Sequence, residues 1–503
     1  MSEASLKKRT ARGIFWNAFG RYSNLVLQIA VSAILARLLS PKDFGIVAMV
    51  LVLSGFMSIF FDAALSPAIV QYDDLDNKDL SGICWFSISL GVGMFLFMAV
   101  CSPYIALFYN TPALQPVAVA MGLIFIFQSL GSVPLALLQR KMDFRSINLI
   151  RLICAFLAAA CAVYLALTGA GYWALVVQNI LYIAGCSLLF FYAAKWLPSF
   201  AFQLKSIKRI FKYSKDLTLF SAINYWARNA DNLLIGKFWG TAMLGYYSHA
   251  YNLMSYPLSL ITQVITPVLH PALASIQENK SHMRAAYLQV LKYISISSFP
   301  AMVVLSLLAP EIVRTLWGNQ WTACVPVFQI LSIVGLVQPI VSTSGCVFQA
   351  CDRTGIHLKL GIINSVIICA GIAAGLTWGM TGVAIGYSIG YGIIILPTMY
   401  VVISVVLEGS LKELFAVIAK PALMTACVGL SLVMWNRFLR GILPGPLHLL
   451  GGTAVAAIVF LIALGVMDRP FLSEFYSLLP RANRSCTSVT PTVAAPTVTP
   501  RSE

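Results

Sequence analysis

Four polar residues near the N-terminus have types and a spacing that suit the binding of a polar or anionic molecule inside a membrane. They are separated by four, three and four positions, so in a helix they share one face. A charge within a spanning helix is costly unless it faces a cavity or a partner. Arg21 has no acidic residue three or four positions away, so we predict that its face lines a substrate cavity. The residues of this first stripe are Asn17, Arg21, Asn24 and Gln28.

A second stripe with similar spacing lies about two hundred residues further along the chain. Its members are separated by three, four and three positions and again share one helical face. We predict that it faces the first stripe across a water-filled cleft. The alternative is that Arg228 and Asp231, three residues apart, only pair with each other. The residues of this second stripe are Ser221, Asn224, Arg228 and Asp231.

Further charged residues are candidates for specialised roles. Arg37 and Lys237 lie near helix ends, where they could contact a lipid headgroup, act in a gate or extend to the interface. Arg151 lies near a basic segment and is a candidate for binding a phosphate or a headgroup. Asp62 and Asp231 are candidates for binding a coupling cation. The alternative for Asp62 is a structural role as the cap of a broken helix.

The composition indicates what kind of molecule must position these residues. Of the 503 residues, 59% are hydrophobic and only 10% are charged, and the mean hydropathy is +0.83. A soluble protein has about a quarter charged residues, so a water-soluble enzyme is excluded. The net charge of +16 does not indicate nucleic-acid binding, because the charges are too few to form a basic face. We predict an all-α integral membrane protein with its basic residues in loops.

Neither the cysteines nor the histidines predict a catalytic or metal site. The 11 cysteines are scattered, with no CxxC pair, and cysteine in an apolar run behaves as a small hydrophobic residue. The five histidines lack a ligand spacing such as HExxH. We therefore expect no catalytic residue, metal, cofactor or nucleic-acid partner.

Apolar runs of about 20 residues, the length needed to cross a bilayer, recur through most of the chain. The segment beyond about residue 480 differs, because it is rich in Thr, Val, Ala and Pro, which is typical of a disordered tail. We predict about 14 transmembrane helices, at residues 13–38, 43–70, 82–108, 113–138, 146–168, 172–195, 213–238, 243–272, 289–309, 322–349, 357–378, 380–406, 415–435 and 447–467.

Basic residues are distributed unevenly between the two sides that these helices define. Clusters precede the first helix and follow the fourth and the sixth. Cytoplasmic loops carry an excess of Lys and Arg, so we predict that both termini are cytoplasmic. Only four basic residues fall on the other side: Lys42, Arg314, Arg437 and Arg440.

The chain contains an internal repeat with an offset of 200 residues. Helices 1–6 and 7–12 have the same order and similar lengths, and because six is even both halves insert with the same orientation. We predict two pseudo-symmetric six-helix lobes at residues 1–205 and 206–407, an additional helix pair at 408–467 and a tail at 468–503. The aligned residues include Asn24 and Asn224, Arg37 and Lys237, and Gly45 and Gly245.

Glycines recur at every fourth position in the last two helices of the second lobe. Such small-residue ridges allow two helices to approach closely. We predict close packing of these helices along Gly371, Gly375 and Gly379 on one and Gly382, Gly386 and Gly390 on the other.

Several stretches resemble the polysaccharide exporters of the MOP superfamily, whose members move multidrug, oligosaccharidyl-lipid and polysaccharide cargo. The resemblance covers about residues 5–470 and is greatest to the lipopolysaccharide and colanic acid exporter type. Its most specific part is Asp-Asn-Leu-Leu-Ile-Gly at 231–236, followed by residues 244–251. The other similar stretches are residues 39–45, 61–71 and 134–144.

This resemblance implies two six-helix lobes arranged in a V around a cationic central cavity. It implies a flippase that moves undecaprenyl-diphosphate-linked oligosaccharide units to the outer leaflet of the bacterial inner (plasma) membrane, for exopolysaccharide, capsule or lipopolysaccharide biosynthesis. Candidate partners are this lipid-linked oligosaccharide, membrane lipids, and a polysaccharide polymerase with assembly proteins. The anionic diphosphate would favour arginine or lysine in the cleft, among them Arg21, Arg228 and Lys237.

Other functions stay open at the level of the sequence. A multidrug or cation antiporter of the same fold would need an acid-rich cavity, whereas the predicted cleft is basic. A membrane-embedded glycan polymerase or glycosyltransferase would need a large outer loop or an acidic catalytic set, and the predicted outer loops are short. Transport could be driven by the membrane potential or by proton or sodium antiport.

Overall fold

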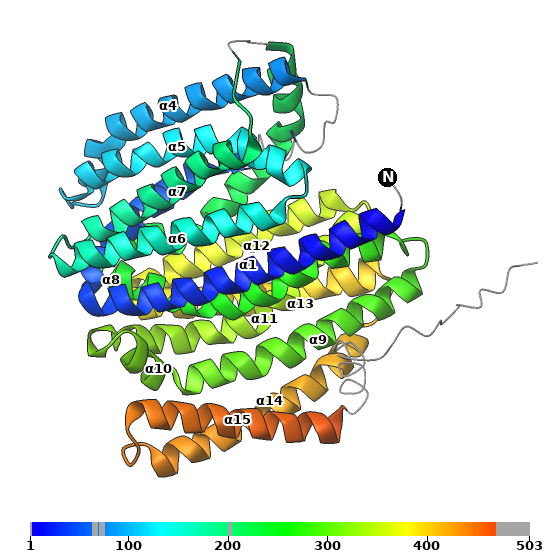
Figure 1. Ribbon diagram of the computed structural model, residues 1–503. Coiled ribbons are helices and arrows are strands. Elements are labelled where there is room, and N and C mark those ends of the chain that lie inside the picture. Colours follow the sequence, from blue (N-terminus) through cyan, green and yellow to red (C-terminus); the bar gives the residue numbers. More distant parts are fainter. Residues whose placement is uncertain (1–2, 63–68, 70–75, 200–203, 469–503) are drawn as a thin grey trace, which may run out of the picture.

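The computed structural model describes residues 3–62, 69, 76–199 and 204–468, and within them the regular structure is helical (Figure 1). We call the end of the bundle where the first helix begins the proximal end, and the opposite end the distal end. A first group of helices comprises α1 (Glu3–Leu38), α2 (Pro41–Asp62), α4 (Asn77–Phe108), α5 (Leu114–Arg140), α6 (Phe144–Leu167) and α7 (Trp173–Ala194). A second group comprises α8 (Leu204–Ala274), α9 (Lys280–Leu307), α10 (Ala309–Leu316), α11 (Cys324–Ala350), α12 (Thr354–Gly375) and α13 (Gly379–Tyr400). A final pair, α14 (Leu411–Leu439) and α15 (Gly445–Met467), follows.

Packing within each group is more extensive than packing between the groups. In the first group α4 packs on α5, α7 packs on α5 and α6, and α1 packs on α6. In the second group α8 and α13 pack on α11, and α12 packs on α13. The two groups meet mainly where α2 packs on α8, whereas α1 has few contacts with α8. The final pair packs on α9 through α14.

The predicted all-helical membrane architecture is confirmed. Each of the 14 predicted segments falls on helix wherever the structure describes it. Eleven stretches, with α12 and α13 counted together, are long and apolar enough to cross a membrane, and a bent segment of α8 gives a twelfth. The short helix α10 was not predicted, and it begins with a proline in its first turn, a position that proline favours.

The longest helical segment, α8, contains both the seventh and the eighth predicted spans. Gly240 interrupts it with a φ of 79°, a left-handed backbone conformation that glycine adopts without a steric penalty. The Tyr247 hydroxyl lies 2.7 Å from Asp231 Oδ2, although 16 residues of straight helix would separate their Cα atoms by about 24 Å. The chain therefore reverses direction at Gly240, as two adjacent spans require.

The predicted glycine contact between α12 and α13 is also confirmed. A Cβ added at Gly371 would collide with the carbonyl of Gly386, and one added at Gly375 would collide with that of Gly382. The converse collisions occur from α13 toward α12. The two backbones are thus in direct contact, which only glycine permits at these positions.

Candidate functional site

Two adjoining cavities form a cleft between the first group and α8. The smaller has a volume of about 210 Å³ and the larger about 510 Å³. Asn24 and Gln28 line both cavities, so we treat the two as one cleft. Along α1 it extends from Gly20 to Leu35, a distance of about 22 Å at 1.5 Å per residue.

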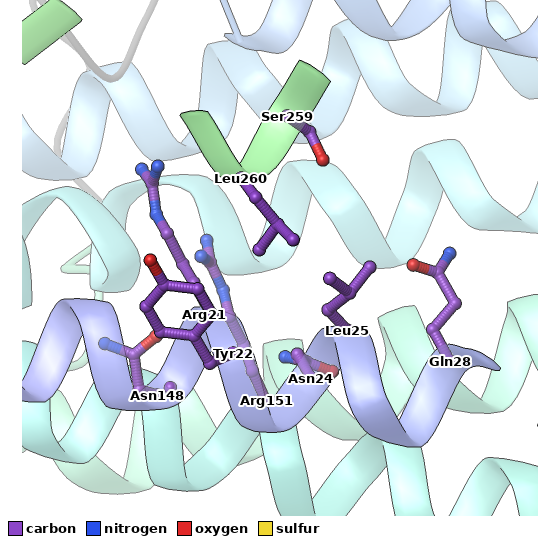
Figure 2. A pocket seen from close by; sticks show the side chains of 10 residues that line it. Arg21, Tyr22, Asn24, Leu25, Gln28, Asn148, Arg151, Ser259 and Leu260 are labelled. Carbon is purple, nitrogen blue, oxygen red and sulfur yellow. The ribbon is translucent and has the colours of Figure 1, made fainter. Parts of the chain in front are cut away.

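The smaller cavity contains the described part of the first polar stripe. Arg21, Asn24 and Gln28 on α1 face Arg151 and Asn148 on α6, and Figure 2 shows the two arginine side chains extended in the same direction. The two helices can approach this closely because α1 has no side chain at Gly20, where a Cβ would collide with the side chain of Asn148. The close contact of α1 and α6 therefore brings two guanidinium groups to one cavity.

The larger cavity is lined by amide and aromatic side chains. Gln178, Asn179 and Tyr182 come from α7, and Asn252 and Tyr256 come from the part of α8 that follows Gly240. Amides offer both donors and acceptors, and a tyrosine combines a hydroxyl with an apolar ring face. Such a surface suits a polar, uncharged ligand with many hydroxyl groups.

A cluster of aromatic rings closes the distal end of the larger cavity. His249, only 6% exposed, stacks on Trp321 with ring centroids 4.0 Å apart. The ring of Phe44 meets His249 edge to face at 4.5 Å, and Trp317 does so at 5.0 Å. Because Phe44 belongs to α2 and the other rings to the second group, the cluster joins the two groups.

The second polar stripe lies elsewhere. Asp231 has an exposed fraction of 0% and accepts hydrogen bonds from the Tyr247 hydroxyl and the Asn232 backbone N–H, each at 2.7 Å. Arg228 lies near the hydroxyl groups of tyrosines in the interior of the second group. Neither residue lines the cleft, and the two described side chains form no ion pair with each other.

Several predicted residues cannot be placed in the cleft. Ser221 is half-buried and does not line either cavity. Arg37 and Lys237 lie at the distal end, where both donate to backbone carbonyls of the opposite group. Three predicted side chains lie outside those that the structure describes: Asn17, Asp62 and Asn224.

The sequence-based interpretation missed part of the cleft wall, although a signal for it was present. Asn252, Tyr256 and Ser259 line the cleft and are separated by four and three positions, which is the spacing of the two polar stripes. They were overlooked because they carry no charge. Gln178 and Asn179 are adjacent polar residues within an otherwise apolar span, which was a second overlooked signal.

The electrostatic character of the cleft follows from its lining. Among the described residues that line it are Arg21 and Arg151, and no aspartate or glutamate. Two guanidinium groups can donate several hydrogen bonds in fixed planes to one phosphate or diphosphate. The cleft can therefore bind an anion near its proximal end and hydroxyl-rich groups further in.

Two solved structures share the fold of this chain. Lipid II flippase MurJ in an inward closed conformation gives a TM-score of 0.74 at 15% sequence identity, covering 91% of this chain and 99% of that chain. An inward-facing multidrug resistance MATE family transporter of the MOP superfamily gives 0.64 at 14% identity, covering 78% of this chain and 99% of that chain. The predicted MOP fold is therefore confirmed.

The sequence itself also has relatives. A family model described as polysaccharide biosynthesis protein matches residues 34–326, which is more than half of the chain. The lipopolysaccharide biosynthesis protein WzxC of Escherichia coli (strain K12) is 27% identical over 374 residues, which cover 73% of this chain and 75% of that protein.

Proposed function

Because the chain belongs to the polysaccharide biosynthesis protein family, we propose that it is a flippase for lipid-linked oligosaccharides used in polysaccharide biosynthesis. The observation that carries this proposal is the cleft, which combines two arginines at its proximal end with an amide- and tyrosine-lined cavity beyond them. A diphosphate joined to a sugar chain has the same sequence of chemical groups: an anion first and hydroxyl groups next.

Arg21 and Arg151 bind the diphosphate in this proposal. A hydrogen bond between charged groups contributes about 1.5–3 kcal/mol, so loss of either arginine weakens binding by about tenfold or more. We retain Asn24 and Gln28 as substrate-binding residues beside them. Arg228 and Asp231 are instead assigned to the interior of the second group, since neither lines the cleft.

The sugar units occupy the larger cavity. Its volume of about 510 Å³ lies within the usual range of about 300–1,000 Å³ for small-molecule sites, which is enough for a short oligosaccharide. Gln178, Asn179 and Asn252 bind hydroxyl groups, while Tyr182 and Tyr256 offer ring faces. The polyprenyl tail stays in lipid, beside the sparse contact between α1 and α8.

Transport proceeds by alternating access of the two lobes, residues 1–205 and 206–407, with residues 408–467 carried along as an additional pair. The distribution of basic loops orients the proximal end toward the cytoplasm of a bacterial cell. An inside-negative potential then favours outward movement of the anionic head, by about 2.3 kcal/mol per charge and 100 mV.

A transporter accounts for this cleft better than an enzyme or a multidrug exporter does. A glycosyltransferase or polymerase needs an acidic catalytic group, and the described lining of the cleft has none. An exporter of organic cations needs a carboxylate in its cavity for the same electrostatic reason. Polymerases and assembly proteins are then partners that use the product of transport.

The test uses cells in which this gene is deleted and replaced by variants. With Arg21→Ala and Arg151→Ala combined, we expect loss of surface polysaccharide and accumulation of its lipid-linked precursor at a normal level of the protein in the membrane. Arg353→Ala, which removes an exposed arginine outside the cleft, is the matched control and should export normally. Normal export by the double variant would refute the proposed diphosphate site.

A further inference from the structure

The distal ends of α1 and of the α10 region exchange hydrogen bonds in both directions. Arg37, in the last turn of α1, donates through Nε to the Leu316 carbonyl at 3.1 Å and through its other nitrogen to that of Thr315. In return Trp321 Nε1 donates to the Ala36 carbonyl at 2.7 Å. Each group of helices thus caps a helix C-terminus of the other.

Lys237 makes the equivalent contact in the opposite direction. It belongs to α8, and its ammonium donates to the carbonyl of Phe108, the last residue of α4. The same ammonium lies 4.7 Å from the centroid of the Phe108 ring, a favourable cation–π distance. Helix C-termini carry a partial negative charge and unpaired carbonyls, so a basic side chain from the other group is well suited to both.

These two contacts are related by the internal repeat. Arg37 and Lys237 are 200 residues apart, as are Gly45 and Gly245. A Cβ added at Gly45 would collide with the Thr241 carbonyl, and one added at Gly245 would collide with the carbonyl of Pro41, which is again 200 residues from Thr241. The distal contact therefore has pseudo-twofold symmetry, with the same register on both sides.

The symmetric contact lies at the closed end of the cleft. The aromatic cluster around His249 is next to it, because Trp321 belongs both to that cluster and to the contact with α1. Between residues that the structure describes, the other hydrogen bonds joining the two groups are those from the Tyr225 hydroxyl to α2, midway along that helix. The charged connections between the groups are thus concentrated at the distal end.

We propose that Arg37 and Lys237 form a two-part latch that holds the distal end of the cleft closed, and that both release their carbonyls when that end opens. This inference rests on the proposed alternating access. It assigns the two residues to a gate rather than to substrate or headgroup binding. Such a latch can reopen reversibly, because the freed carbonyls lie at helix ends, where water can replace the lost donors.

The test measures the distance between the two groups directly. Spin labels are placed at two exposed distal positions, Thr168→Cys after α6 and Asn319→Cys after α10, in a variant without the native cysteines that still exports polysaccharide. The protein is purified into lipid nanodiscs without any substrate. We expect one distance population with an intact latch, and a second, longer population when Arg37→Ala and Lys237→Ala are combined.

Two further variants separate the latch from general damage to the fold. Arg314→Ala removes an exposed arginine of α10 at the same end and should leave the distance unchanged. The conservative pair Arg37→Lys and Lys237→Arg should restore the single population. Each single alanine variant should give a smaller shift, which keeps the test valid if the double variant does not fold.

An unchanged distance in the folded alanine variants would overturn the latch, whatever the cargo is. Because no substrate is present, this result would leave the proposed transport function standing. Conversely, a shifted distance in a protein that does not flip lipid-linked oligosaccharide would support the latch and refute the function.

Discussion

At the level of single residues, the sequence located one polar stripe in the cleft and misplaced the other. Arg21, Asn24 and Gln28 share one face of α1 and line the cavity, as the helical spacing alone predicts. Asp231 also follows that spacing, but the reversal at Gly240 brings Tyr247 onto its carboxylate. Spacing describes the face of one helix, and it does not tell which other helix covers that face.

The hydroxyl group of Tyr247 should therefore matter for stability. We expect Tyr247→Phe to lower the free energy of unfolding by about 1–2 kcal/mol, because the fully buried carboxylate of Asp231 loses its side-chain donor. Tyr246→Phe is the matched control, since the hydroxyl of this neighbouring residue has no hydrogen bond within the described structure. The thermal midpoint in detergent should fall for the first variant only. Equal midpoints would indicate that Asp231 does not depend on Tyr247.

At the level of elements, the sequence predicted helices well and their ends less well. Apolar length gave the spans, and the glycine ridges gave the contact between α12 and α13. The prediction missed α10, which is too short to show apolar periodicity, and it separated the halves of α8 by a loop where the structure has a reversal at one glycine. Such short features depend on local backbone geometry rather than on hydrophobic length.

The contact between α12 and α13 gives a prediction for two glycines on one helix. Gly386→Val should destabilise the protein by about 2 kcal/mol or more, because its side chain would push against the carbonyl of Gly371. Gly392→Val makes the same substitution on the same helix where nothing lies within 4 Å of a Cβ, and it should change stability little. Thermal unfolding in detergent compares the two, and similar midpoints would argue against close packing.

At the level of the whole molecule, symmetry explains more than composition does. The offset of 200 residues, read from the sequence, recurs in the reciprocal contacts of Gly45 with Thr241 and of Gly245 with Pro41. The composition predicted a membrane protein but not a cleft. The roles of Arg37 and Lys237 could not be chosen from the sequence, because their partners are backbone carbonyls of the other group, which leave no trace in residue types.

The basic loops predict the orientation of the whole bundle. A fluorescent protein fused after residue 467 should fold and fluoresce in the cytoplasm, and a periplasmic phosphatase fused there should be inactive. The same phosphatase inserted in the loop between Leu439 and Gly445, at the distal end, should be active. An active phosphatase after residue 467 would reverse the proposed orientation, and with it the direction of transport.

The most direct test of the central claim is a measurement of leaflet exchange. Lipid-linked oligosaccharide extracted from cells lacking this gene is incorporated into liposomes with the purified protein, and a sugar-modifying enzyme added outside reports the accessible fraction. The proposed function predicts that the protein makes nearly all of the lipid accessible over time, and that the variant with Arg21→Ala and Arg151→Ala leaves about the outer half accessible, as protein-free liposomes do. If the wild-type protein gives the same accessible fraction as protein-free liposomes, the protein is not a flippase for this lipid.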